Sequence, residues 1–184
     1  MVNPKPPRRG FKMSNTKHHI VDSADSNGIW KILEEIADPE VPVLSIMDLG
    51  IVRDVKTNND EVEITITPTY SGCPAMDVIR MNIRMVLLQL GYKKINIATA
   101  LSPAWTTDWM SDTGKEKLKA FGIAPPTTKQ QVCHTELFHV GEAIECPRCN
   151  SYNTRLISQF ASTACKALYV CEDCKEPFDY FKCH

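Results

Sequence analysis

The chain has 184 residues, 43% of them hydrophobic and 23% charged, which is the composition of a folded globular protein and allows one ordinary domain plus a small one. The formal net charge of -1 gives no general attraction to nucleic acid or to an anionic membrane. The longest apolar runs span only a few residues, too short for a membrane-spanning helix. We therefore expect no nucleic acid and no membrane among the partners.

Residues 1–25 are predicted to form a disordered basic tail. The Arg8-Arg9 pair within it resembles a twin-arginine export signal, but such a signal continues into an apolar stretch, and residues 13–19 are polar. We therefore expect a cytoplasmic protein.

Residues 26–123 are predicted to form a small α+β domain. Its hydrophobic residues recur first at helical spacing and then alternate with polar residues along two strand-like segments. A second segment at helical spacing and a third alternating segment follow. The expected elements are a helix, two strands, a helix and a strand, over residues 26–37, 51–55, 61–67, 76–90 and 94–101. In such an α-β-β-α-β order, the helices pack on one face of a sheet.

Two signals mark the end of this domain. Thr113 and Glu116 have the spacing of a capping box, which predicts a short helix that ends near Phe121, with Gly122 as its stop. The next segment, residues 124–141, begins with prolines, threonines and glutamines and shows no periodicity. We interpret it as a linker.

Cys73 lies at the predicted junction between the second strand and the second helix, within Ser71-Gly72-Cys73-Pro74. Because Pro74 suits the first helical turn, Cys73 is expected at or beside the N-cap. Unpaired N–H groups and the helix dipole favour a thiolate there, and the thiolate is the form that attacks electrophiles and binds metals. The alternative is a small buried hydrophobe at a tight turn. The chemistry of the residues leaves both interpretations open.

Residues 142–184 are predicted to form a zinc ribbon. Six of the eight cysteines follow residue 145, and in a chain without an export signal that distribution indicates metal binding rather than disulfides. Two Cys-x-x-Cys pairs, separated by 21 residues that can form a β-hairpin, supply a four-cysteine zinc site: Cys146, Cys149, Cys171 and Cys174. The same ligands could instead hold an iron–sulfur cluster or form a redox dithiol.

Cys165 and Cys183 are not needed for this site. Each is either a small packed residue or a group that contacts or exchanges with the metal. From Glu142 onward there are six acids and five bases, with no basic stripe, so the ribbon is expected to dock protein rather than nucleic acid.

Several motifs resemble those of known proteins. Three of them are similar to the core motifs of the small iron–sulfur assembly domains related to SufT: Asp38-Pro39-Glu40-Val41-Pro42-Val43, Met47-Asp48-Leu49-Gly50-Ile51-Val52 and Thr67-Pro68-Thr69-Tyr70-Ser71-Gly72-Cys73-Pro74. Together with Cys146-Pro147-Arg148-Cys149 and the segment 162–183, they resemble the PaaD family, the D proteins of the phenylacetyl-CoA 1,2-epoxidases of phenylacetate degradation. The resemblance covers residues 27–184.

The resemblance implies a cytoplasmic accessory protein whose partners are the other phenylacetyl-CoA epoxidase subunits. It implies a role in iron–sulfur cluster assembly or insertion, with the iron–sulfur reductase subunit as the client. It also implies that Cys73 handles the iron or cluster, because the cysteine of this turn is the reactive one in related domains. Asp48 matches a further family position, expected near the same edge of the sheet. The implied cofactors are a structural zinc and a transient iron or iron–sulfur cluster.

Three functions are therefore compared. The favoured one is a non-catalytic maturation factor that acts through Cys73. A thiol-dependent enzyme is weakened because residues 26–123 contain no histidine that could serve as the base. The third is a structural subunit or scaffold of the complex in which Cys73 is inert.

Overall fold

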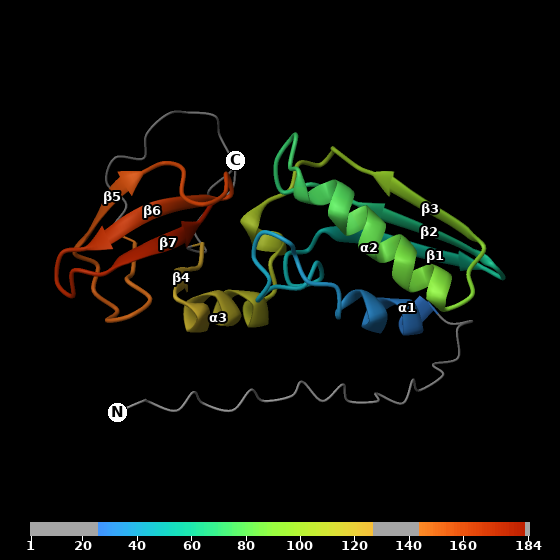
Figure 1. Ribbon diagram of the computed structural model, residues 1–184, viewed down its shortest axis with the longest axis horizontal. Helices are drawn as coiled ribbons and strands as arrows, with labels where there is room; N and C mark the ends of the chain where they lie inside the picture. Colours follow the sequence, from blue (N-terminus) through green and yellow to red (C-terminus); the bar gives the residue numbers. More distant parts are fainter. Residues whose placement is uncertain (1–25, 127–143, 183–184) are drawn as a thin grey trace, which may run out of the picture.

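Two β-sheets organise the residues that the computed structural model describes, which are 26–126 and 144–182. The first sheet has the strand order β1-β2-β3, and the second has the order β4-β7-β6-β5. The two sheets lie at opposite ends of an elongated molecule (Figure 1). This arrangement confirms the expected α+β class with a C-terminal ribbon.

The first sheet is a hairpin to which a parallel strand is added. β1 (Val52–Asn58) and β2 (Glu61–Ile66) pair antiparallel, and the turn between them places Asn59 at a φ of 50°. β3 (Lys94–Thr99) pairs parallel with β2, because α2 (Ala75–Gln89) carries the chain back across the sheet. In Figure 1, α2 lies over one face of all three strands.

The side chains of β2 and α2 explain why these segments fold as predicted. Val62, Ile64 and Ile66 alternate with polar residues along β2 and are fully buried. Such a period of two places every second side chain on the covered face of the sheet. α2 ends as expected, since Leu90 is its C-cap and Gly91 follows with a φ of 92°, a left-handed conformation that glycine adopts without strain.

The first helix is shorter than predicted. α1 spans Ser26–Leu33, whereas the sequence pattern predicts a helix over residues 26–37. Beyond Leu33 the amides of Glu35 and Ile36 bond to carbonyls three residues back, not four. The chain then turns away because Pro39 disfavours helical backbone at the residue before it.

A short 3-10 helix, η1 (Thr107–Trp109), leads into α3 (Asp112–Phe121). The predicted cap of α3 was Thr113, and this is wrong: Ser111 is the N-cap, and its hydroxyl accepts a hydrogen bond from the amide of Gly114 at 2.9 Å. The end of α3 is as predicted, with Gly122 at a φ of 91°.

The second sheet is the ribbon with one added strand. β5 (Thr154–Ser158), β6 (Lys166–Cys171) and β7 (Pro177–Phe181) are antiparallel neighbours. β4 (Ile123–Ala124), which directly follows α3, pairs parallel with β7 and extends the ribbon sheet. The predicted linker, residues 124–141, begins within β4, and from residue 127 onward it lies outside the described residues.

The ribbon and the first sheet share a hydrophobic core. Phe181, at the end of β7, is buried among the residues that surround α1 and α2. Its ring meets that of Trp105 edge-on, with centroids 6.4 Å apart. The indole of Trp105 in turn donates a hydrogen bond to the carbonyl of Leu49 at 2.8 Å. A second, smaller core of ribbon residues surrounds Cys146 and Cys171.

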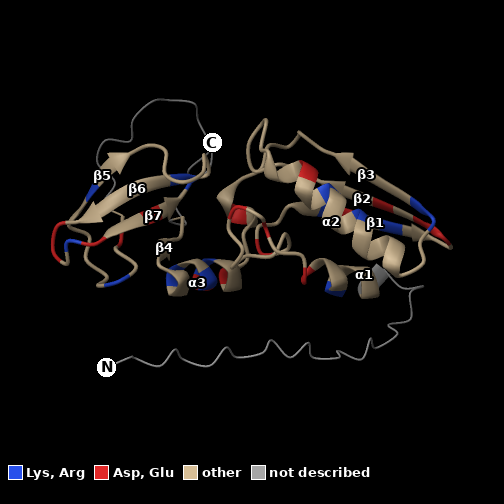
Figure 2. Ribbon diagram, in the orientation of Figure 1, with Lys and Arg blue, Asp and Glu red and all other residues tan. Residues whose placement is uncertain are grey.

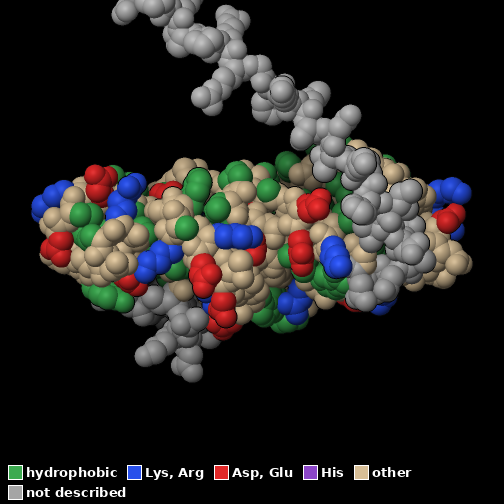
Figure 3. Space-filling model, turned by 90° about the horizontal axis from the view of Figure 1, so that it is seen from below, with side chains coloured by type: hydrophobic (Ala, Val, Ile, Leu, Met, Phe, Trp, Pro, Cys, Tyr) green, Lys and Arg blue, Asp and Glu red, His purple; other side chains and the backbone are tan. Residues whose placement is uncertain are grey.

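Charged residues of both signs are spread along the whole molecule (Figure 2). On the face that carries α1 and α3, acidic and basic side chains lie among polar and hydrophobic ones (Figure 3). In the described part of the chain, none of the helices combines the length and the apolar character needed to cross a bilayer.

Candidate functional site

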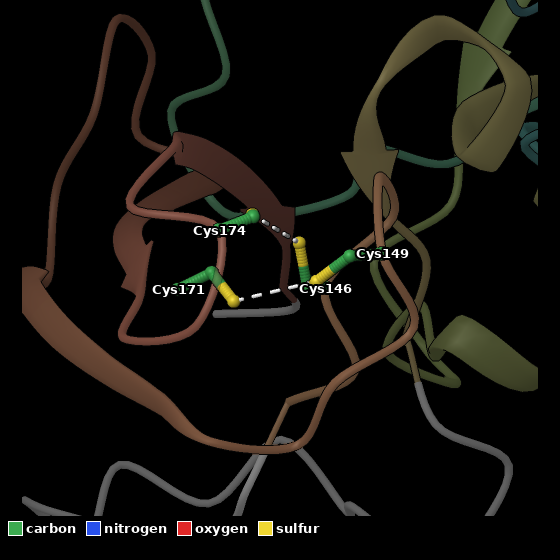
Figure 4. Close-up of side chains that lie close together, drawn as sticks. All are labelled: Cys146, Cys149, Cys171 and Cys174. Carbon is green, nitrogen blue, oxygen red and sulfur yellow. Dashed lines mark hydrogen bonds between the residues drawn. The ribbon is translucent and has the colours of Figure 1, made fainter.

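The four ribbon cysteines predicted to bind zinc lie together at one end of the second sheet. All four Sγ atoms are within 4.8 Å of one another. Cys146 and Cys174 are 3.8 Å apart at sulfur, and Cys149 and Cys171 are 3.5 Å apart (Figure 4). Zinc–sulfur bonds of about 2.3 Å in a tetrahedron place the sulfurs about 3.8 Å from one another. The spacing of the four sulfurs therefore suits one tetrahedrally bound metal ion such as zinc.

The two Cys-x-x-Cys pairs are held by the same backbone turn. The amide of Asn150 donates to the carbonyl of Cys146, and the amide of Lys175 donates to that of Cys171, both at 2.9 Å. Asn150 and Lys175 both adopt left-handed backbone, with φ values of 60° and 64°. This repeated turn brings each pair of thiols to one side of its loop, where both can reach the same ion.

Backbone amides also point at the sulfurs of this group. The amide of Ser151 donates to the sulfur of Cys149, and the amide of Glu176 donates to that of Cys174. Hydrogen bonds from N–H groups stabilise the thiolate, which is the zinc-binding form. The peptide turns thus supply both the geometry and part of the electrostatic support for the metal.

Cys73 lies where the sequence predicted, in the turn between β2 and α2 and directly before Pro74, the N-cap of α2. Its thiol is half-buried. The amide of Ala75 and the hydroxyl of Thr69 both form hydrogen bonds with its sulfur. The side chain of Tyr70 contacts the same sulfur through a hydrogen bond.

The pKa of the Cys73 thiol is raised, not lowered as its place at the start of α2 predicts. Burial raises the pKa of the Cys73 thiol, and the nearby carboxylates of Glu40 and Asp38 raise it further. The hydrogen bonds from Ala75 and Thr69 lower the pKa, but they do not outweigh the burial. Desolvation of a charged sulfur here exceeds the stabilisation that the start of the helix provides.

A small cavity adjoins Cys73 and is closed on one side by the ribbon. Its lining includes Asp38, Glu40, Cys73 and Cys165 together with apolar side chains. The volume is about 10 Å³, close to what one water-sized sphere requires. The sulfur of Cys165 lies 3.4 Å from Oε2 of Glu40. The sequence predicts Cys165 to be a packed residue or a contact of the ribbon metal, and no local pattern places it beside Glu40.

Asp48 does not line this cavity. Its Oδ2 accepts hydrogen bonds from the amide of Ser45 at 3.0 Å and from the ammonium of Lys117 at 2.6 Å. Its Oδ1 accepts one from the hydroxyl of Ser111 at 3.0 Å. Burial alone would raise the pKa of this carboxyl, but the bonds from Lys117, Ser45 and Ser111 hold the pKa below its usual range. These contacts favour a structural role for Asp48, as an anchor between the loop before β1 and the start of α3.

Known proteins resemble the two parts of the chain. Residues 27–98 match the family described as iron–sulfur cluster assembly protein, and residues 130–182 match the PaaD zinc beta ribbon domain. A protein of Escherichia coli named as the D component of 1,2-phenylacetyl-CoA epoxidase is 49% identical over 84% of this chain and 91% of its own length.

Two further similarities concern the first part of the chain. An Fe-S protein maturation auxiliary factor of Porphyromonas gingivalis is 36% identical over 46% of this chain and 81% of its own length. The crystal structure of a domain of unknown function from Bacillus anthracis is 32% identical, with a TM-score of 0.47, over 50% of this chain and 89% of that one.

Proposed function

Because the chain belongs to the PaaD family, the D proteins of phenylacetyl-CoA epoxidases, we propose that it is an accessory maturation protein of such an epoxidase complex. The iron–sulfur assembly family matched by residues 27–98 supports a role in assembling or inserting clusters. The similarity to an Fe-S maturation factor supports the same role. The other epoxidase subunits are then its partners.

The placement of Cys73 is the single observation that carries this proposal at the level of residues. The thiol lies at a strand–helix turn, beside a small cavity lined by carboxylates. One cysteine and neighbouring acids give an incomplete ligand set for iron or for a cluster, which is the cargo in this role. Incomplete coordination suits a protein that passes its cargo on, because the remaining ligands come from the recipient.

The structure weakens the alternative of a thiol-dependent enzyme. The described residues include no histidine that could act as a base, and burial raises the pKa of Cys73. A cysteine nucleophile needs either a base or a lowered pKa to maintain its thiolate. The histidines that could fold back as bases, His134 and His139, lie outside the described residues.

The proposed client is the iron–sulfur reductase subunit of the complex, as the family resemblance implies. In this proposal the zinc of the ribbon is structural. Its four thiolate ligands close the two turns, so metal binding contributes directly to the folding of the ribbon. The ribbon then presents a folded surface that docks on protein partners.

The test replaces Cys73 by serine and measures the cluster content of the reductase in cells. We expect Cys73→Ser to fold and to keep the ribbon zinc, but to lower both cluster content and epoxidase activity. The matched control is Ser71→Ala, an exposed position in the same turn, which should leave both unchanged. Normal cluster content in Cys73→Ser would favour the scaffold function instead.

A further inference from the structure

Cys165 brings the ribbon into direct contact with the cavity beside Cys73. It immediately precedes β6, and its carbonyl accepts a hydrogen bond from the amide of Lys182 at 3.0 Å. Its side chain is 4% exposed and belongs to the core of the first sheet. Cys73 and Cys165 are far apart in the sequence, yet both line the same cavity.

Two carboxylates, those of Asp38 and Glu40, line the cavity together with the two thiols. Glu40 lies 3.4 Å from the sulfur of Cys165. Asp38 is 6% exposed, and its Oδ1 accepts hydrogen bonds from the amides of Glu40 at 2.9 Å and of Val41 at 2.7 Å. These two bonds hold the turn that aims Glu40 toward Cys165. The turn that carries the carboxylates is therefore positioned by the backbone.

Two basic residues act by charge on this group without lining the cavity. Burial raises the pKa of Asp38, and the charge of Lys166 lowers it. Burial lowers the pKa of Lys182, and the charge of Cys165 raises it. Lys166 lies 3.3 Å from Asp179, and Lys182 lies over the ring of Phe160, 4.4 Å from its centroid. Among the described residues that line the cavity, none is basic. Buried carboxylates and thiols with no base in the wall of their cavity are stabilised when a cation binds between them.

We propose that Cys73, Cys165 and Glu40 bind one divalent transition-metal ion in this cavity, as a second metal site apart from the ribbon zinc. The cavity of about 10 Å³ accommodates one ion and not a preformed cluster. Two thiolates and a carboxylate select a metal such as Fe(II), Co(II) or Zn(II) over Mg(II) or Ca(II). Among the described residues, only the ribbon cysteines already have their donor atoms gathered to metal-binding distance. Metal binding here therefore requires the side chains of Cys73, Cys165 and Glu40 to rotate toward the cavity that they line.

This site needs both parts of the chain. The assembly-like part contributes Cys73 and Glu40, and the ribbon contributes Cys165. The proposal goes beyond the maturation role, because it concerns metal binding by the isolated full-length protein and not delivery to a client. A bound Fe(II) would be the single-ion form of the cargo.

Cobalt titration of the full-length chain tests the site. Anaerobic, reduced protein that carries one zinc is titrated with Co(II), while sulfur-to-cobalt charge-transfer absorption and bound metal are recorded. Zinc binds more tightly than cobalt to a given site, so the ribbon keeps its zinc. We expect one cobalt per chain with thiolate absorption. Cys73→Ser, Cys165→Ser and Glu40→Gln should each weaken its binding at least about tenfold.

Matched controls are Cys133→Ser, a cysteine outside the described residues, and Asp77→Asn, an exposed acid in the first turn of α2. Both should bind cobalt like the unaltered chain. Retained zinc and an unchanged circular dichroism spectrum show that each variant is folded. The proposal is overturned if no cobalt binds beside the zinc, if binding survives in Cys165→Ser, or if Cys133→Ser removes it.

The cobalt titration and the cellular test of the proposed function can give different answers. Cobalt binding that depends on Cys165, together with normal reductase clusters in cells that carry Cys73→Ser, would support the metal site and reject the maturation role. Cluster loss in those cells without any cobalt binding would support maturation and reject this site.

Discussion

Cys73 and Asp48 come from neighbouring sequence motifs, but their side chains have different surroundings. Cys73 faces a cavity with thiol and carboxylate neighbours. Asp48 is bonded to Lys117, Ser45 and Ser111 through both of its oxygens. A motif marks the position of a residue in the chain, whereas its role depends on what the fold places beside it.

The pH dependence of stability tests the role of Asp48. Because its pKa is lowered in the folded state, its contribution is fully present above the unfolded pKa of about 3.9 and is lost as pH falls through the folded value. We expect Asp48→Asn to lower the free energy of unfolding at pH 7 by about 1–3 kcal/mol. The difference from the unaltered chain should shrink at pH 3.

Urea unfolding at both pH values measures this difference. The control is Asp54→Asn, whose side chain is 51% exposed and pairs with an exposed lysine on the same strand, and it should cost less than about 1 kcal/mol. Equal effects of the two substitutions at pH 7 would show that Asp48 is not a structural anchor.

Each of the two Cys-x-x-Cys turns of the ribbon brings a pair of thiols to one side of its loop, but each also holds one residue other than glycine in left-handed backbone. Asn150 tolerates left-handed backbone better than most residues, but Lys175 does not. The repeated turn therefore does not follow from the local backbone preference of Lys175. A sequence pattern of Cys-x-x-Cys indicates the ligands, and the strain becomes visible only in the folded turn.

Replacing Lys175 by glycine should stabilise the ribbon. Glycine removes a left-handed strain of about 1–2 kcal/mol, and it loses part of this gain through the greater freedom of the unfolded chain. The exposed pair with Glu172 at 3.3 Å contributes little. We expect a net gain of about 0.5–1 kcal/mol in the zinc-loaded protein, measured by thermal unfolding.

The control for this change is Lys93→Gly, which removes an exposed lysine outside the left-handed region and should give no gain. A loss of stability in Lys175→Gly as large as that in Lys93→Gly would contradict the explanation by backbone strain.

The ribbon forms part of the surroundings of Cys73. Phe181 and Cys165 are buried in the core of the first sheet. β4 also joins the end of α3 to the ribbon sheet. A change in the ribbon is therefore expected to reach Cys73, although Cys73 lies in the other half of the chain.

Loss of the ribbon zinc should expose Cys73. Cys146→Ser removes one ligand, and we expect it to release zinc and to unfold the ribbon, because binding energy there is folding energy. Cys165 and Phe181 would then leave the cavity wall. Peptide-resolved mass spectrometry should show faster alkylation of Cys73 in this variant than in protein that carries only its ribbon zinc.

Alkylation of Cys73 in the intact protein after zinc removal and zinc re-addition provides the control, since re-addition should restore the slow rate. An unchanged rate in Cys146→Ser, with zinc lost, would show that the ribbon does not shield Cys73. A ribbon that stays protease-resistant without zinc would contradict the coupling between metal and folding.

The sequence by itself determined the α-β-β-α-β order of the first part, the turn that carries Cys73 and the four-cysteine group of the ribbon. These features are local: the strand period of Val62, Ile64 and Ile66, the proline after Cys73 and the Cys-x-x-Cys spacing each act over a few residues. Only the tertiary structure decided that Cys165 adjoins Glu40 and that Lys117 donates a hydrogen bond to Asp48. It also decided that burial raises the pKa of Cys73 by more than the hydrogen bonds from Ala75 and Thr69 lower it. Each of these depends on side chains brought together from distant parts of the chain, and desolvation is a property of the packed surroundings that no local pattern records.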